Sequence, residues 1–90
     1  MTIDLGKIQR SIEHYGKETQ STVCMEECAE LIQAISKMKR GKGDMENLSE
    51  EMADVYICLE MLMQMYGVNE SKVNAWIDYK QKREEERKQK

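Results

Sequence analysis

Two short acidic stretches of this sequence place carboxylates at a spacing that suits metal or acid–base chemistry. The segment EECAEL, which begins at Glu26, has a near copy in the segment EEMADV further along the chain. Glu27 and Glu30 are three residues apart, as are Glu51 and Asp54, and residues at this spacing share one face of a helix. If the two helices face each other, four carboxylates meet between them.

The apolar residues around these acids indicate which way the carboxylates point. On a helical wheel with roughly 100° per residue, Glu27 lies in the middle of an apolar stripe and Glu30 lies at its edge. Glu51 and Asp54 hold the same two positions on a second stripe. The apolar neighbours within roughly 60° are Val23, Cys24, Leu31, Ala34 and Met38 for the first stripe, and Val55, Cys58, Leu62, Met65 and Tyr66 for the second. The sequence therefore predicts that Glu27 and Glu51 face the core.

The inward-facing carboxylates need a partner, because a carboxylate in a core is unfavourable unless it is paired, protonated or bound to a cation. The neighbouring core positions offer no Lys or Arg, so a divalent metal is the simplest partner. Four carboxylates form a hard oxygen cage that suits Mg²⁺ or Mn²⁺. A di-iron site would need Glu-x-x-His on the partner helices, and His14, the single histidine, does not stand in such a motif.

The composition predicts an all-α protein. The ninety residues include no Pro and no Phe, while Glu, Lys, Met, Leu, Ile and Ala are plentiful. We predict a four-helix bundle-like single domain over residues 1–90, with helices that end near Tyr15, Lys39 and Tyr66 and a solvated, fraying tail over about residues 80–90. Cap candidates are Thr2 or Asp4, then Thr19, Ser21 or Thr22, then Asn47, and last Asn69 or Ser71.

Size, charge and cysteine content limit the class of protein. A small helical chain with wide apolar stripes is predicted to form a homo-oligomer through its helix faces, as a dimer or a tetramer. The net charge of −3 argues against nucleic-acid binding, and no apolar run is long enough to span a membrane. Three cysteines, an odd number on apolar faces, are expected to be buried thiols of a cytoplasmic protein.

The acidic pattern resembles the signature of the MazG-like all-α NTP pyrophosphatases. The shared features are Glu-Glu-x-x-Glu from Glu26, Glu-x-x-Asp from Glu51, and the short connection between them, and the resemblance covers roughly residues 20–83. Members of this family hydrolyse nucleoside triphosphates, often damaged or non-standard ones, to the monophosphate and pyrophosphate. The resemblance therefore implies an Mg²⁺-dependent pyrophosphohydrolase of ribo- or deoxyribonucleoside triphosphates, with a house-cleaning role.

The resemblance also implies roles for individual residues. Glu26 would be an accessory catalytic group, either a ligand of a second metal or a base that orients water. Lys80 and Arg83 match the Lys and Arg that face the phosphates from the last helix of family members. The metal ligands, which also form the catalytic centre, would be Glu27, Glu30, Glu51 and Asp54, with Mg²⁺ as the cofactor and Mn²⁺ as an alternative.

Two more residues are candidates for contact with the substrate. Lys37 falls near Glu30 on the helical wheel and would face a ligand bound at the acidic site. Trp76 is a candidate wall of the nucleobase pocket, although core packing is the commoner role of such a residue. The chain carries neither the domain duplication nor the extra helices of larger relatives, so a second subunit is expected to complete the pocket.

Two other classes of function stay open on the sequence alone. A non-catalytic helical interaction module would use its acids to bind a basic partner, and it would leave Glu27 and Glu51 exposed to solvent. A structural metal site would hold an oligomer together without any hydrolysis.

Overall fold

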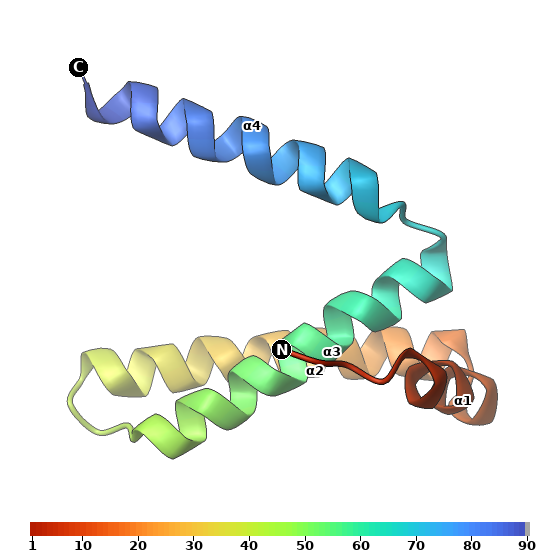
Figure 1. Ribbon diagram of the computed structural model, residues 1–90. Coiled ribbons are helices and arrows are strands. Elements are labelled where there is room, and N and C mark those ends of the chain that lie inside the picture. Colours follow the sequence, from red (N-terminus) through yellow and green to blue (C-terminus); the bar gives the residue numbers. More distant parts are fainter. Residues whose placement is uncertain (90) are drawn as a thin grey trace.

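The protein is built from four helices and contains no β-strand within residues 1–89, which the computed structural model describes (Figure 1). The helices are α1 (Leu5–Tyr15), α2 (Lys17–Lys39), α3 (Met45–Tyr66) and α4 (Glu70–Lys88). The predicted all-α fold is therefore confirmed, and the first three helices end at the predicted residues. None of the described helices is long and apolar enough to cross a membrane.

A single glycine separates α1 from α2. Gly16 has a φ of 90°, which residues with a side chain rarely adopt, so it can end one helix and start the next. The sequence prediction of a side-chain cap at Thr19, Ser21 or Thr22 is wrong for this reason, because α2 has already begun at Lys17.

Side-chain caps define the starts of the other helices. Asp4 and Asn69, both predicted, accept backbone N–H hydrogen bonds at 3.1 and 2.7 Å. The predicted cap of α3 is wrong, because Asp44 and not Asn47 holds that position. The Asp44 carboxylate accepts the Asn47 N–H at 2.6 Å, so the earlier residue closes the first turn and Asn47 becomes part of the helix.

The core lies where α1, α2 and α3 meet. α2 and α3 form an antiparallel pair, and α1 packs against both (Figure 1). The buried residues at the centre are Ile8, Cys24, Cys58 and Met61, and the partly buried residues around them are Ile3, Ile12, Leu62 and Met65. The two predicted apolar stripes therefore meet at the α2–α3 interface, which also brings the two acidic stretches face to face.

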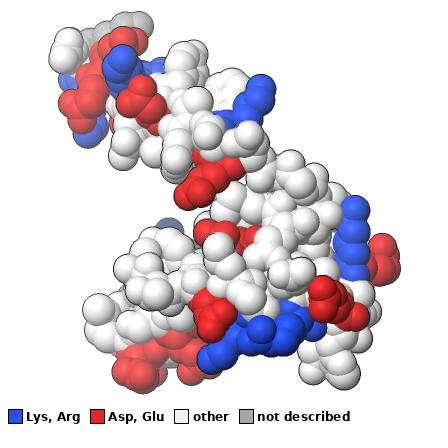
Figure 2. All heavy atoms as spheres, turned by 45° about the vertical axis from the view of Figure 1, so that its right-hand side comes forward, with Lys and Arg blue, Asp and Glu red and all other residues white. Residues whose placement is uncertain are grey.

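α4 stands apart from the other helices. It projects from the end of α3 and contributes no buried residue (Figure 1). Trp76 is 58% exposed, so the core packing that is common for such a residue does not occur within this chain. The predicted tail remains helical to Lys88, and Lys90 lies outside the described residues. Figure 2 shows charged side chains gathered at the free end of α4 and a hollow between α4 and the rest of the molecule.

Candidate metal centre

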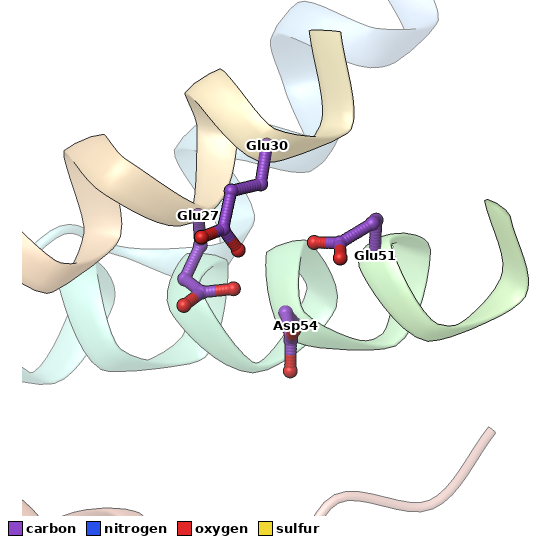
Figure 3. A group of neighbouring side chains, drawn as sticks. All are labelled: Glu27, Glu30, Glu51 and Asp54. Atoms are coloured by element: carbon purple, nitrogen blue, oxygen red, sulfur yellow. The ribbon is translucent and has the colours of Figure 1, made fainter. Parts of the chain in front are cut away.

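Four carboxylates meet between α2 and α3 (Figure 3). Glu27 and Glu30 reach from α2, and Glu51 and Asp54 reach from α3. One oxygen atom from each carboxylate lies within 4.8 Å of the other three. The structure thus brings together the four residues that the helical wheel placed on facing stripes.

The four side chains differ in burial. Glu51 is 9% exposed, and Glu27 and Asp54 are half-buried. Glu30 is exposed. The buried end of the cluster therefore lies against the core, while the exposed end leaves a cation and its ligand access from solvent.

The cluster has the acceptor capacity that a cation needs. The Oε2 atoms of Glu27 and Glu51 are buried and accept no hydrogen bond. The salt bridges formed by the described residues both lie in α4, so no Lys or Arg neutralises the four carboxylates. A set of oxygen donors without nitrogen or sulfur suits a hard divalent cation such as Mg²⁺. The residues present therefore fit a metal of this class.

Close contact and burial favour protons on the cluster when metal is absent. A hydrogen bond with Asp54 is the largest cause that raises the pKa of Glu27 to about 7, and burial and the charges of the other carboxylates add to it. That bond exists only while one of the two carboxyls is protonated, since two ionised carboxylates have no proton to donate. Burial, followed by the charges of Glu30 and Asp54, raises the pKa of Glu51. A cation that binds here must therefore displace a proton.

We expect metal affinity to rise with pH until it levels off near the Glu27 pKa of about 7. Below that value the cation competes with one proton, so affinity should rise about tenfold per pH unit. The stability of the metal-free fold should show the opposite trend and fall as the pH rises. Folding raises the Glu27 pKa from 4.5 to about 7, so the folded state holds the proton more tightly and stability falls as pH rises through this window.

Calorimetric titration with Mn²⁺ measures the affinity, and thermal melts in EDTA measure the stability of the metal-free fold. Glu27→Gln is the control, because an amide cannot titrate and both profiles should become flatter. A wild-type affinity that does not change between pH 5.5 and pH 7 would contradict the assignment of the proton to Glu27.

Two candidate residues of α2 lie outside the cluster. Glu26 is exposed and is not one of the four converging carboxylates. Lys37 is exposed near the C-terminal end of α2, where its backbone carbonyl accepts hydrogen bonds from the N–H groups of Lys42 and Gly43 at 2.9 and 3.1 Å. Neither of the ion pairs among residues 1–89 involves its ammonium group, which a ligand can reach from solvent.

The remaining candidates all lie on α4. No hydrogen bond or ion pair among residues 1–89 joins Trp76, Lys80 or Arg83 to the four carboxylates. The sequence did not predict that the Arg83 guanidinium would lie 5.7 Å from the centre of the Tyr79 ring, with its Nε atom buried. The spacing of four residues between them is the signal that could have shown it, because such residues are neighbours on a helix.

Comparison with known proteins places this geometry in a family. A family model described as the MazG nucleotide pyrophosphohydrolase domain matches residues 16–86, which include α2, α3 and most of α4. The chain therefore belongs to the MazG nucleotide pyrophosphohydrolase family, and α1 lies outside the matched range. No curated protein and no solved structure matches this chain.

Proposed function

We propose that this protein is an Mg²⁺-dependent pyrophosphohydrolase that cleaves a nucleoside triphosphate, with ribose or deoxyribose, to the monophosphate and pyrophosphate. Family membership supports the reaction class. The observation that carries the metal dependence is the convergence of four carboxylates, two of which have a buried oxygen without a partner. A house-cleaning role, in which the substrate is a damaged or non-standard nucleotide, is part of this proposal.

The four converging carboxylates would hold the metal. A bound divalent cation would neutralise charge on the triphosphate and would lower the pKa of a coordinated water. Glu30, the exposed member, would lie on the substrate side, and Glu51 would fix the buried side. Glu26, exposed and adjacent to Glu27, would orient water or a second cation. Mn²⁺ would serve in place of Mg²⁺, because both prefer oxygen ligands.

The phosphate groups and the base would be bound by a face of α4. On a helical wheel, Lys80 and Arg83 lie within roughly 40° of Trp76, so an aromatic ring and two cations share one side of the helix. This combination suits a nucleotide, since the ring can stack on a base and the cations can meet phosphates. Lys37, on α2, would add a further charge.

α4 does not reach the cluster of its own chain, so we propose that a second copy supplies this face. The chain leaves apolar surface uncovered on α2, where Met25 is 73% and Ile32 is 68% exposed. A groove of about 420 Å³ between α3 and α4 is also lined mostly by apolar residues, among them Tyr56, Leu59 and Ile77. Surfaces of this kind favour association in a small helical protein.

Light scattering at micromolar concentration should therefore give a mass of at least two chains. Ile32→Asp, which places a charge on the uncovered face of α2, should shift the protein toward the monomer. Gln33→Asp is the matched control, because Gln33 is also exposed but polar. A monomeric wild type would contradict the proposed assembly.

The test of the proposed activity is pyrophosphate release from a panel of NTPs and dNTPs, with Mg²⁺ and with EDTA. We expect release that requires the metal and differs between bases. A protein that loses its oligomeric state in EDTA but releases no pyrophosphate in Mg²⁺ would instead have a structural metal site. A protein that needs no metal for either property would be an interaction module.

Replacing both Lys80 and Arg83 with Ala should raise KM or lower kcat, because two charges that meet the phosphates are lost. We expect kcat/KM to fall by about 10- to 100-fold while Mn²⁺ affinity changes little. Lys82→Ala with Lys88→Ala removes the same charge from other sides of α4 and is the matched control. If the two double variants are equally active, the face of α4 that carries Lys80 and Arg83 has no role in substrate binding.

The proposed setting is the cytoplasm. All three cysteines are free thiols, which a reducing compartment preserves. The net charge of −3 does not favour binding to nucleic acid, so we do not propose nucleic acid as a partner.

A further inference from the structure

Two cysteines that the acidic chemistry does not use face each other across the α2–α3 interface. Cys24 and Cys58 are each 3% exposed. The Cys24 thiol donates to the backbone carbonyl of Cys58 at 3.8 Å and lies 3.9 Å from Sδ of Met61. The neighbouring Cys24 thiol is also among the causes that raise the pKa of Cys58. Helix packing thus places the Cys24 thiol against Cys58 in the core, with one cysteine on each of the two facing helices.

The thiol pair lies one helical turn from the carboxylates. Cys24 precedes Glu27 by three residues on α2, and Cys58 follows Asp54 by four residues on α3. A covalent bond between the two sulfurs would therefore join the same two helices that carry the four carboxylates, immediately beside them.

We propose that Cys24 and Cys58 form a redox-responsive pair whose oxidation to a disulfide fixes α2 against α3 next to the metal centre. Two S–H bonds break and one S–S bond forms, and the two protons and two electrons pass to the oxidant. A small-molecule disulfide accepts them and becomes two thiols, and the azo reagent diamide accepts them and becomes a hydrazine. The third cysteine, Cys28, is exposed, so the prediction of three buried thiols is wrong for this residue, and Cys28 takes no part in the pair.

Burial makes this response slow rather than immediate. Burial is the largest cause that raises the pKa of Cys58 to about 12, so the thiol stays protonated at neutral pH. Because the thiolate is the reactive form, an oxidant must wait for local opening of α2 from α3. The pair is thus expected to survive brief exposure to an oxidant and to respond to a sustained one.

The disulfide should tighten metal binding. When they are ionised and no metal is bound, the carboxylates of α2 and α3 repel one another, which favours a wider separation of the two helices. A cross-link one turn away opposes that separation, so less of the binding free energy is needed to draw the ligands together. We expect the Kd for Mn²⁺ to fall by at least threefold on oxidation.

The test uses the full chain with Cys28→Ser, which removes the exposed thiol and prevents cross-links between chains through it. After diamide treatment, intact mass should fall by about 2 Da, the two thiol hydrogens, without dimers on a non-reducing gel. The melting temperature should rise by roughly 10 °C because the cross-link restricts the unfolded chain. The Mn²⁺ Kd is then measured before oxidation, after it, and after reduction with dithiothreitol.

Cys28→Ser with Cys58→Ala is the matched control, and it should show none of these changes. A wild-type pair that gives no 2 Da loss after prolonged oxidation near the melting temperature would overturn the pairing. Formation of the disulfide with an unchanged or weaker Mn²⁺ affinity would overturn its link to the metal centre. Neither readout depends on hydrolysis, so the inference stands or fails independently of the proposed activity.

Discussion

Replacing Glu51 with Gln is expected to abolish metal-dependent hydrolysis while leaving the metal-free fold at least as stable as that of the wild type. The substitution keeps the shape of the side chain but removes one charge and one strong ligand from the buried side of the cluster. We expect kcat/KM to fall by roughly a thousandfold or more, because the site would lose both metal affinity and charge neutralisation.

The stability arm of this experiment distinguishes a metal ligand from a salt-bridge residue. Burial and the charges of Glu30 and Asp54 raise the pKa of Glu51, so its ionised form is unfavourable in the metal-free fold. A neutral amide removes that repulsion. If Glu51 were instead paired with a cation, the variant would leave a buried charge alone and would melt well below the wild type.

Thermal melts of both proteins in EDTA and in Mg²⁺ separate these cases. Mg²⁺ should raise the wild-type melting temperature through the linkage of binding to folding, and should have little effect on Glu51→Gln. Glu50→Gln is the matched control, since Glu50 is the adjacent acid and is exposed. Glu50→Gln should keep the activity and the response to Mg²⁺. A Glu51→Gln protein that melts far below the wild type in EDTA would contradict the metal-ligand role.

Mixing two impaired variants should restore activity if α4 of one chain completes the site of another. One parent carries Glu51→Gln, and the other carries Lys80→Ala with Arg83→Ala. In a dimer that exchanges subunits freely, half of the molecules are mixed, and each mixed dimer has one site built from an intact cluster and an intact α4. About a quarter of the wild-type activity should therefore return. If α4 acts on its own chain, every site stays defective.

A second mixture provides the control. A chain that carries Glu51→Gln, Lys80→Ala and Arg83→Ala together is mixed in equal amount with the wild type. When α4 acts across the interface, both sites of a mixed dimer are defective, and about a quarter of the activity remains. When α4 acts within its own chain, the wild-type half of each mixed dimer still works, and about half remains. The two mixtures must agree on one arrangement, and a wild type without activity would show that the proposed reaction itself is wrong.

The acidic cluster could be predicted because helical periodicity fixes the direction of a side chain before any tertiary contact is known. Glu27 and Glu51 were placed on apolar faces by their neighbours, and two apolar faces of adjacent helices have to meet. The same periodicity cannot give the register between helices. For that reason the contact of Cys24 with Cys58 emerged only from the structure, although both residues were expected in the core.

The cap of α3 could not be predicted because two nearby residues have a similar propensity to cap a helix. Asp44 and Asn47 both cap helices well, and only the backbone conformation at the start of α3 decided for Asp44. The position of α4 was beyond sequence reasoning for a different reason. Val73, Trp76 and Ile77 look like core residues on a wheel, and a wheel does not tell whether other residues of the same chain cover them; in this structure all three are exposed.

In the proposed assembly, the connection between α3 and α4 would decide which copy α4 can reach. Gly67 ends α3 with a φ of 67° and a ψ of 32°, a left-handed conformation that favours glycine, and only Val68 precedes the cap of α4 at Asn69. α4 projects away from the other helices after this short hinge (Figure 1), and such an arm would suit a domain swap in the proposed assembly. A longer or differently turned hinge would let the same helix fold back and compete with the proposed exchange between chains. The choice between a self-contained and a shared nucleotide site would then rest on three residues of backbone rather than on the residues of the site.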